Sequence, residues 1–166
     1  MAVETTQNKR VGVIATESTI QSGLYQQLIT EADPAITVYG KPCPLFVPLV
    51  EEGWTKDPIT EEVARRYLAE ILDKDIDTLI MGCTHYPLLY ETFNRILDYK
   101  VTLIDSGQCA AKAVRNTLLK NGMLSDRTEP GTTEYNVTDE IETFDKTASI
   151  FLGEPVTGAV NRIELL

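Results

Sequence analysis

Three residues that can do acid–base chemistry follow one short apolar run. The run Thr78–Met81 is typical of a buried strand, it breaks at Gly82, and Cys83, Thr84 and His85 come next. A cysteine can exchange a proton as its thiolate, and an imidazole next to it, here the chain's only histidine, can assist. Ligands of open parallel sheets bind at the carboxyl ends of the strands. The order of residues therefore predicts a candidate site at the end of this strand.

Each of these residues also has an ordinary structural interpretation. A free cysteine is most often a buried, inert thiol, and a lone histidine is most often a hydrogen-bonded structural residue. Pro87 suits the first turn of a helix, and a helix that begins there would favour the thiolate of Cys83. Thr84 offers a hydroxyl and a backbone N–H that suit a carboxylate at the same place.

Two further segments hold polar residues that a site could use. The segment from Lys41 to Pro48 contains three prolines, so it is a rigid connection, and the carboxylate Glu51 follows it. Cys43, between two prolines and next to apolar residues, is interpreted as a packing residue. Thr16 and Thr19, in a turn after the first strand, either cap a helix or hold a carboxylate.

The pattern of apolar residues predicts an α/β domain with a doubly wound, mainly parallel sheet, flavodoxin-like in broad class. The expected strands are Val11–Ala15, Ile36–Tyr39, Thr78–Met81 and Val101–Ile104. Between and after them we expect four helices: one from Ile20 whose face carries Leu24 and Leu28, one capped by Thr60, one opened by Pro87, and one over 108–120. A short helical turn is also expected from Leu49 to Trp54. Asp105 and its neighbours are expected to cap the last of these, in which Cys109 matches no motif.

Three regions are expected along the chain. Residues 1–10 are predicted to be a loose N-terminal segment, 11–122 the α/β domain, and 123–166 a linker with a β-α-β tail. In the tail the pattern predicts a strand over 134–137, a helix that starts in a capping box of Asp139 and Glu142 and ends at Gly153, and a last strand over 160–165. The tail is too short for a core of its own, so its apolar residues must pack on another surface.

Composition excludes several functions. The 166 residues carry a net charge of −10, which argues against general binding of nucleic acid or of an anionic membrane. Three unpaired cysteines predict reduced thiols in the cytoplasm. We find no signal-peptide pattern, no apolar run long enough to span a membrane, and no Gly-rich phosphate loop. One histidine and scattered cysteines do not make a metal site, so no metal is expected.

The blocks from Gly82 to Leu89 and from Pro42 to Glu51 resemble motifs of the glutamate racemases, which belong to the cofactor-independent aspartate/glutamate racemase superfamily. The resemblance implies that Cys83 is a catalytic thiol and that His85 and Glu51 assist it. It further implies that Thr84, His85, Thr16 and Thr19 contact the substrate, L- or D-glutamate, and that neither pyridoxal phosphate nor another cofactor is needed.

The resemblance also implies that part of the enzyme is absent from this chain. Full-length members of the family carry a first half with a Cys-Asn-Thr motif that holds the first catalytic cysteine, and their tail returns to complete that half. We therefore expect this chain to be the second half plus the tail, to need the missing N-terminal half as a partner, and to be inactive alone. The activity implied for the whole enzyme is supply of D-glutamate for peptidoglycan synthesis, and so for cell wall biogenesis and cell shape.

Two other functions stay open at this point. One is a catalytically silent α/β binding or interaction module that keeps half of a site. The other is an isomerase similar to aspartate racemase. A homodimer is also left open as the assembly.

Overall fold

Four parallel strands form the central sheet in the computed structural model, which describes residues 1–164. They are β1 (Arg10–Ala15), β2 (Thr37–Pro42), β3 (Thr78–Met81) and β4 (Thr102–Asp105), in the order β2-β1-β3-β4. The predicted parallel sheet is confirmed. The second strand runs further than expected because Ala15 pairs with Pro42, a residue that the end of an edge strand tolerates. This order places the topological switch point, where such sheets bind ligands, between β1 and β3.

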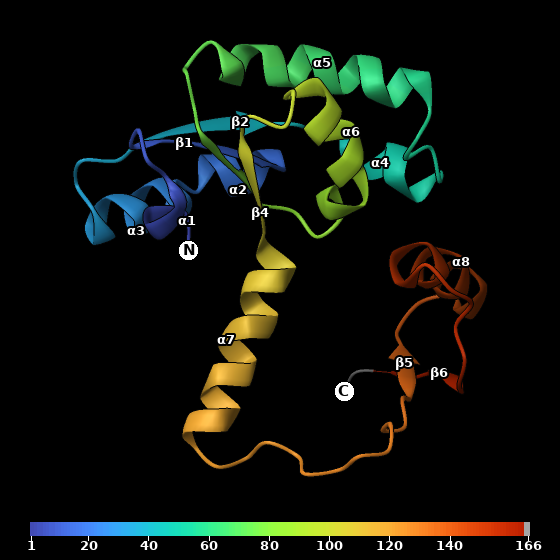
Figure 1. Ribbon diagram of the computed structural model, residues 1–166. Coiled ribbons are helices and arrows are strands. Elements are labelled where there is room, and N and C mark those ends of the chain that lie inside the picture. Colours follow the sequence, from blue (N-terminus) through green and yellow to red (C-terminus); the bar gives the residue numbers. More distant parts are fainter. Residues whose placement is uncertain (165–166) are drawn as a thin grey trace. The chain divides into compact units, whose positions relative to one another are not determined.

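Both faces of the sheet are buried. On β1 and β3, Val13 and Ile80 point into one apolar cluster, while Ile14 and Leu79 point into the other. The helices α5 (Pro58–Leu72) and α6 (Tyr90–Ile96) pack on one face, and α1 (Ala2–Thr5) and α3 (Leu24–Ala32) pack on the other (Figure 1). This covering on two sides explains why the strands read as continuous apolar runs.

The first predicted helix is broken into two. The spacing of Ile20, Leu24 and Leu28 fits one helix, but α2 (Glu17–Gln21) stops before Gly23, which has a φ of +67°, and α3 starts after it. The side chains expected to be buried are outside: Leu24 and Leu28 are 54% and 55% exposed. The left-handed backbone at Gly23 turns α3, so that a different helix face meets the sheet.

Two other helix starts differ from the prediction. Asp57, not Thr60, caps α5: its carboxylate accepts a hydrogen bond from the Ile59 N–H, and Pro58 takes the first helical position. Thr60 is instead buried and donates to the Trp54 carbonyl. The short helix expected after Leu49 begins earlier, as α4 (Phe46–Glu51).

The helices predicted after β3 and after β4 are both present, but each begins at a different residue from the one expected. After Cys83 comes a 3-10 turn, η1 (Tyr86–Leu89), and α6 begins only after it. After β4, Asp105 caps α7 (Ser106–Lys120) by accepting hydrogen bonds from the N–H groups of Gly107 and Gln108. The capping interpretation of Asp105 is thus confirmed, and α7 begins two residues before the expected range.

The N-terminal segment is not loose. It forms α1, and the Asp77 carboxylate accepts hydrogen bonds from Thr6 Oγ1 at 2.7 Å, Gln7 N at 2.6 Å and Asn8 N at 2.7 Å. Burial alone raises the pKa of Asp77, but the hydrogen bonds together lower it by more, so the pKa lies below its ordinary value. A single carboxylate therefore ties the segment to the start of β3.

The chain divides into two compact units, Met1–Gly122 and Met123–Leu166. The second holds β5 (Tyr135–Val137), α8 (Ile141–Leu152) and β6 (Val160–Arg162), with β5 parallel to β6. Glu140 precedes α8 without a side-chain cap, because the Asp139 carboxylate accepts from the neighbouring Glu140 N–H; the expected capping box is absent. Gly153 ends α8 as predicted. Of the last predicted strand, Leu165 lies outside the described residues.

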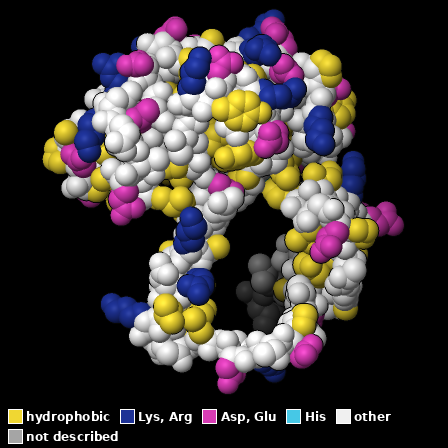
Figure 2. All heavy atoms as spheres, in the orientation of Figure 1, with side chains coloured by type: hydrophobic (Ala, Val, Ile, Leu, Met, Phe, Trp, Pro, Cys, Tyr) yellow, Lys and Arg dark blue, Asp and Glu magenta, His cyan; other side chains and the backbone are white. Residues whose placement is uncertain are grey.

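The second unit leaves apolar side chains exposed. No residue of α8 is buried, and Ile141, Phe151, Leu152 and Ile163 are among the exposed large apolar residues. Apolar side chains lie next to acidic ones on the visible face of this unit, and apolar and charged side chains are mixed over that of the first unit (Figure 2). Among the described residues, no helix is both long and apolar enough to cross a membrane.

Candidate active site

The turn after β3 positions the cysteine. The Gly82 N–H donates to the Ile14 carbonyl at 2.8 Å, which holds the turn against the end of β1. A Cβ at Gly82 would lie 3.2 Å from both the Ala15 Cβ and the Ile14 oxygen, and 3.1 Å from Tyr25 Cε2. Only glycine fits this position without a shift of its neighbours. Cys83 therefore follows β3 at the switch point of the sheet, half-buried.

Three predicted residues lie around the imidazole of a fourth, His85. His85 Nδ1 lies 3.9 Å from Cys83 Sγ and 3.3 Å from Thr84 Oγ1. On the other side of the ring, His85 Nε2 lies 3.2 Å from Glu51 Oε1. The His85 side chain is 20% exposed and that of Glu51 is 52% exposed. The structure thus brings Glu51 to the imidazole from α4, although it is distant in the sequence.

This arrangement can move a proton. A carboxylate at Nε2 favours the tautomer with a proton on that nitrogen. Nδ1 then presents its lone pair to the Cys83 thiol and can accept the thiol proton or return it. The expected helix dipole contributes less than a regular helix would, because a four-residue 3-10 turn follows Cys83.

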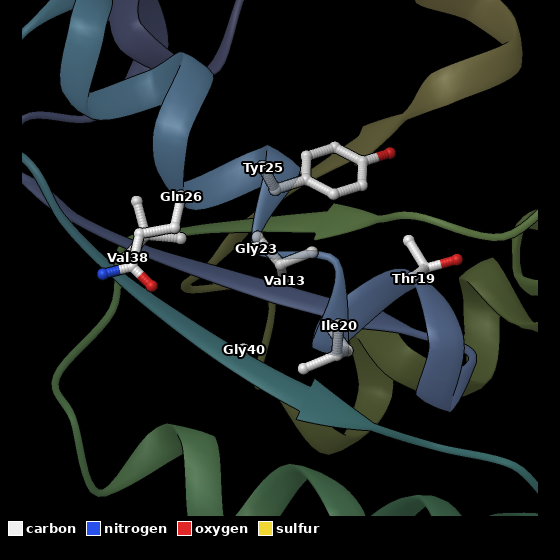
Figure 3. Close-up of a pocket in the computed structure, with 8 residues that line it drawn as sticks. All are labelled: Val13, Thr19, Ile20, Gly23, Tyr25, Gln26, Val38 and Gly40. Atoms are coloured by element: carbon white, nitrogen blue, oxygen red, sulfur yellow. The ribbon is translucent and has the colours of Figure 1, made fainter.

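The two threonines follow β1, Thr16 in the turn and Thr19 within α2. Their Oγ1 atoms share a hydrogen bond of 3.0 Å, and Thr16 precedes α2 without capping it through its side chain. The contact of Gly82 with Ala15 makes this turn a neighbour of the cysteine turn. Thr19 also lines a pocket of about 190 Å³ together with Tyr25 and residues of β1 and β2 (Figure 3).

The other two cysteines lie outside this cluster. Cys43 is fully buried, as the packing interpretation predicted, and burial raises the pKa of its thiol to about 12. Its carbonyl accepts a hydrogen bond from the buried Tyr86 hydroxyl at 2.8 Å. Cys109, on the first turn of α7, donates from Sγ to Met1 Sδ at 3.2 Å. Among the described residues, no group of three or more His, Cys, Asp or Glu side chains could hold a metal ion.

Sequence reasoning missed Tyr25. Its ring packs against Gly82, and its hydroxyl points to the same side as that of Thr19 (Figure 3). The only signal for it was the Ser22-Gly23 pair, which breaks the helix just before Tyr25.

Fold and site together define a class of protein. It is an open α/β domain with a thiol, an imidazole and a carboxylate in contact at the switch point of a parallel sheet. The model of the family described as Asp/Glu/Hydantoin racemase matches residues 1–114, and this chain belongs to that family.

Curated relatives and solved structures agree with this assignment. The chain is 43% identical over 156 residues to the glutamate racemase of Persephonella marina, covering 94% of this chain and 57% of that protein. It is 40% identical over 154 residues to the glutamate racemase of Thermoanaerobacter sp. (strain X514), covering 93% of this chain and 58% of that protein.

Among solved structures, the glutamate racemase of Francisella tularensis in complex with D-glutamate matches with a TM-score of 0.85 and 38% identity, over 94% of this chain and 58% of that one. A glutamate racemase isoform of Bacillus anthracis matches with a TM-score of 0.90 and 31% identity, over 99% and 60%. The chain therefore spans less than two thirds of the length of the relatives it matches.

Proposed function

We propose that this chain is part of a glutamate racemase that inverts the α-carbon of glutamate without a cofactor. The observation that carries the proposal is the contact of Cys83 with His85 and of His85 with Glu51, in a family member whose curated relatives are glutamate racemases. The product, D-glutamate, would serve peptidoglycan synthesis in the cytoplasm.

The proposed step is a proton exchange at a thiol. The Cys83 thiolate takes the α-proton of L-glutamate, so the Cα–H bond breaks, an S–H bond forms and the electron pair stays on the substrate. A thiol on the opposite face then delivers its proton to the α-carbon. His85 takes or returns the Cys83 proton at Nδ1, and Glu51 keeps the ring oriented through Nε2.

The neighbouring hydroxyls suit the charged ends of the substrate. Thr84 lies beside the imidazole, and the paired hydroxyls of Thr16 and Thr19 lie at the start of α2, which follows the neighbouring strand β1. Hydroxyls and turn N–H groups bind carboxylates by donating hydrogen bonds to them. We assign these three threonines to substrate binding.

The second thiol must come from a part of the enzyme that lies outside this chain. Cys43 is buried with a thiol pKa raised to about 12, and Cys109 Sγ donates to Met1 Sδ, so we assign neither as the thiol that faces Cys83 across a substrate. The relatives are longer than the region matched, which leaves room in them for such a segment. The chain alone is therefore expected to lack racemase activity, and the exposed apolar face of α8 would pack against the completed enzyme.

The test compares this chain alone with a fusion protein that supplies the part of a racemase outside the matched region. The part of the Thermoanaerobacter racemase outside the matched region is fused to this chain, and circular dichroism follows L-glutamate over time. We expect racemisation by the fusion, loss of about 100-fold or more of the rate on Cys83→Ala, and an unchanged rate on Cys109→Ser. An inactive fusion that folds would contradict the proposal and favour a silent binding module. Faster turnover of L-aspartate would favour the aspartate racemase alternative.

A further inference from the structure

Tyr25 closes the space beside the cysteine turn. Its Cε2 atom would lie 3.1 Å from a Cβ at Gly82, so the ring is in direct contact with the backbone that carries Cys83. The Ala15 Cβ and the Ile14 oxygen would each lie 3.2 Å from the same Cβ. The turn therefore packs against both the end of β1 and an aromatic ring from α3.

The helix break directs Tyr25 to this position. Gly23 adopts a φ of +67°, and the Ser22 hydroxyl donates to the Thr19 carbonyl at 2.7 Å and accepts from the Leu24 N–H at 3.3 Å. These contacts fix the start of α3, whose second residue is Tyr25. Figure 3 shows the ring rising from this point, with its hydroxyl directed away from Val38 and Gln26.

The electrostatics of the phenol agree with this geometry. Burial is the largest cause that raises the pKa of Tyr25, followed by electrostatic interaction with Cys109 and Cys83. The raised pKa keeps the phenol neutral near neutral pH.

We propose that Tyr25 is a positioning residue for Cys83: its ring holds the Gly82 turn so that the thiol stays within reach of His85 Nδ1. The alignment at stake is the 3.9 Å separation between Cys83 Sγ and that nitrogen. The role in racemisation rests on the proposed function, but the positioning itself is a property of this chain and can be measured without turnover.

The test is a double-mutant cycle on the alkylation of Cys83. The full chain is treated with iodoacetamide between pH 6 and 9, and mass spectrometry measures the rate at Cys83. His85→Ala is made in the parent and in Tyr25→Phe, Tyr25→Leu and Tyr25→Ala. A residue that aligns thiol and imidazole must couple to His85 in this cycle.

Three results are expected. His85→Ala slows alkylation about fivefold or more in the parent and in Tyr25→Phe, which keeps the ring. In Tyr25→Ala and Tyr25→Leu it changes the rate less than twofold, because thiol and imidazole are already misaligned. Tyr135→Ala is the control: Tyr135 packs on Phe144 within the second unit, with ring centroids 5.6 Å apart, so its loss removes an aromatic contact but preserves the His85 effect.

An unchanged His85 effect in folded Tyr25→Leu would overturn the proposal, and so would its loss in Tyr135→Ala. Circular dichroism confirms that each variant is folded, and Tyr25→Leu keeps apolar bulk at the site should the alanine variant unfold. Coupling in the chain together with an inactive fusion enzyme would contradict the proposed function and leave the positioning role standing.

Discussion

Replacing Asp77 with asparagine removes the charge that anchors the N-terminal segment. Four donors converge on this carboxylate: the hydroxyls of Thr6 and Thr78 and the backbone N–H groups of Gln7 and Asn8. A hydrogen bond to a charged group contributes about 1.5–3 kcal/mol. The asparagine amide keeps one oxygen that can accept from the buried Thr6 and Thr78 hydroxyls, but its NH2 group then faces the N–H groups of Gln7 and Asn8, which are exposed and can turn to water. We therefore expect a loss of about 2–3 kcal/mol, close to the contribution of one such bond.

The pH dependence gives this prediction its sign. The pKa of Asp77 is lowered in the folded state, so its contribution is complete above the unfolded value of about 3.9 and disappears as the pH falls through the folded value. Between pH 6 and pH 3 the parent chain should lose more stability than Asp77→Asn does.

Urea unfolding at both pH values measures the free energy of unfolding. Unchanged m-values would show that the substitution does not alter the surface exposed on unfolding. The control is Asp73→Asn, an exposed carboxylate at the end of α5, which should change the free energy of unfolding by less than about 0.5 kcal/mol. If the free energy of unfolding falls equally between pH 6 and pH 3 in the parent and in Asp77→Asn, this role of Asp77 is wrong.

Three further outcomes follow from the site. Gly82→Ala should cost about 1–3 kcal/mol in the free energy of urea unfolding, because its Cβ meets the Ile14 oxygen at 3.2 Å; an unchanged value would show that the turn has spare room. Glu51→Gln in the fusion enzyme should slow racemisation about fivefold, since a half-exposed charge contributes about 1 kcal/mol and the amide oxygen can still accept from His85, while Glu52→Gln should have no effect. Native Cys43 should resist iodoacetamide at pH 8, because burial raises its pKa to about 12; rapid labelling seen by mass spectrometry would contradict that burial.

The sheet was predictable because its signal is local. Each strand is an apolar run buried on both faces, and the alternation with helices fixes a parallel arrangement. The helix ends were less predictable. Asp57 and Thr60 are both good capping residues, and only the buried contact of Thr60 with the Trp54 carbonyl decides between them. The break at Gly23 was missed because the apolar spacing around it fits one continuous helix.

The residues of the site were predictable from their motifs, but their contacts were not. The sequence places Cys83, Thr84 and His85 together, and the structure adds that Glu51 reaches Nε2 of the same ring. The contact of Tyr25 with Gly82 joins segments far apart in the chain, so no local pattern could indicate it. Long-range packing of this kind follows from the fold, not from spacing.

Incorporation of solvent deuterium into the product tests whether Cys83 works as one of two thiols on opposite faces of the α-carbon. The fusion enzyme is given L-glutamate in D₂O, and proton NMR follows the α-position of both isomers at early times. The account predicts deuterium in the first D-glutamate formed, protium in the L-glutamate that remains, and neither product nor exchange with Cys83→Ala. D-glutamate that keeps the substrate's own α-proton would contradict it.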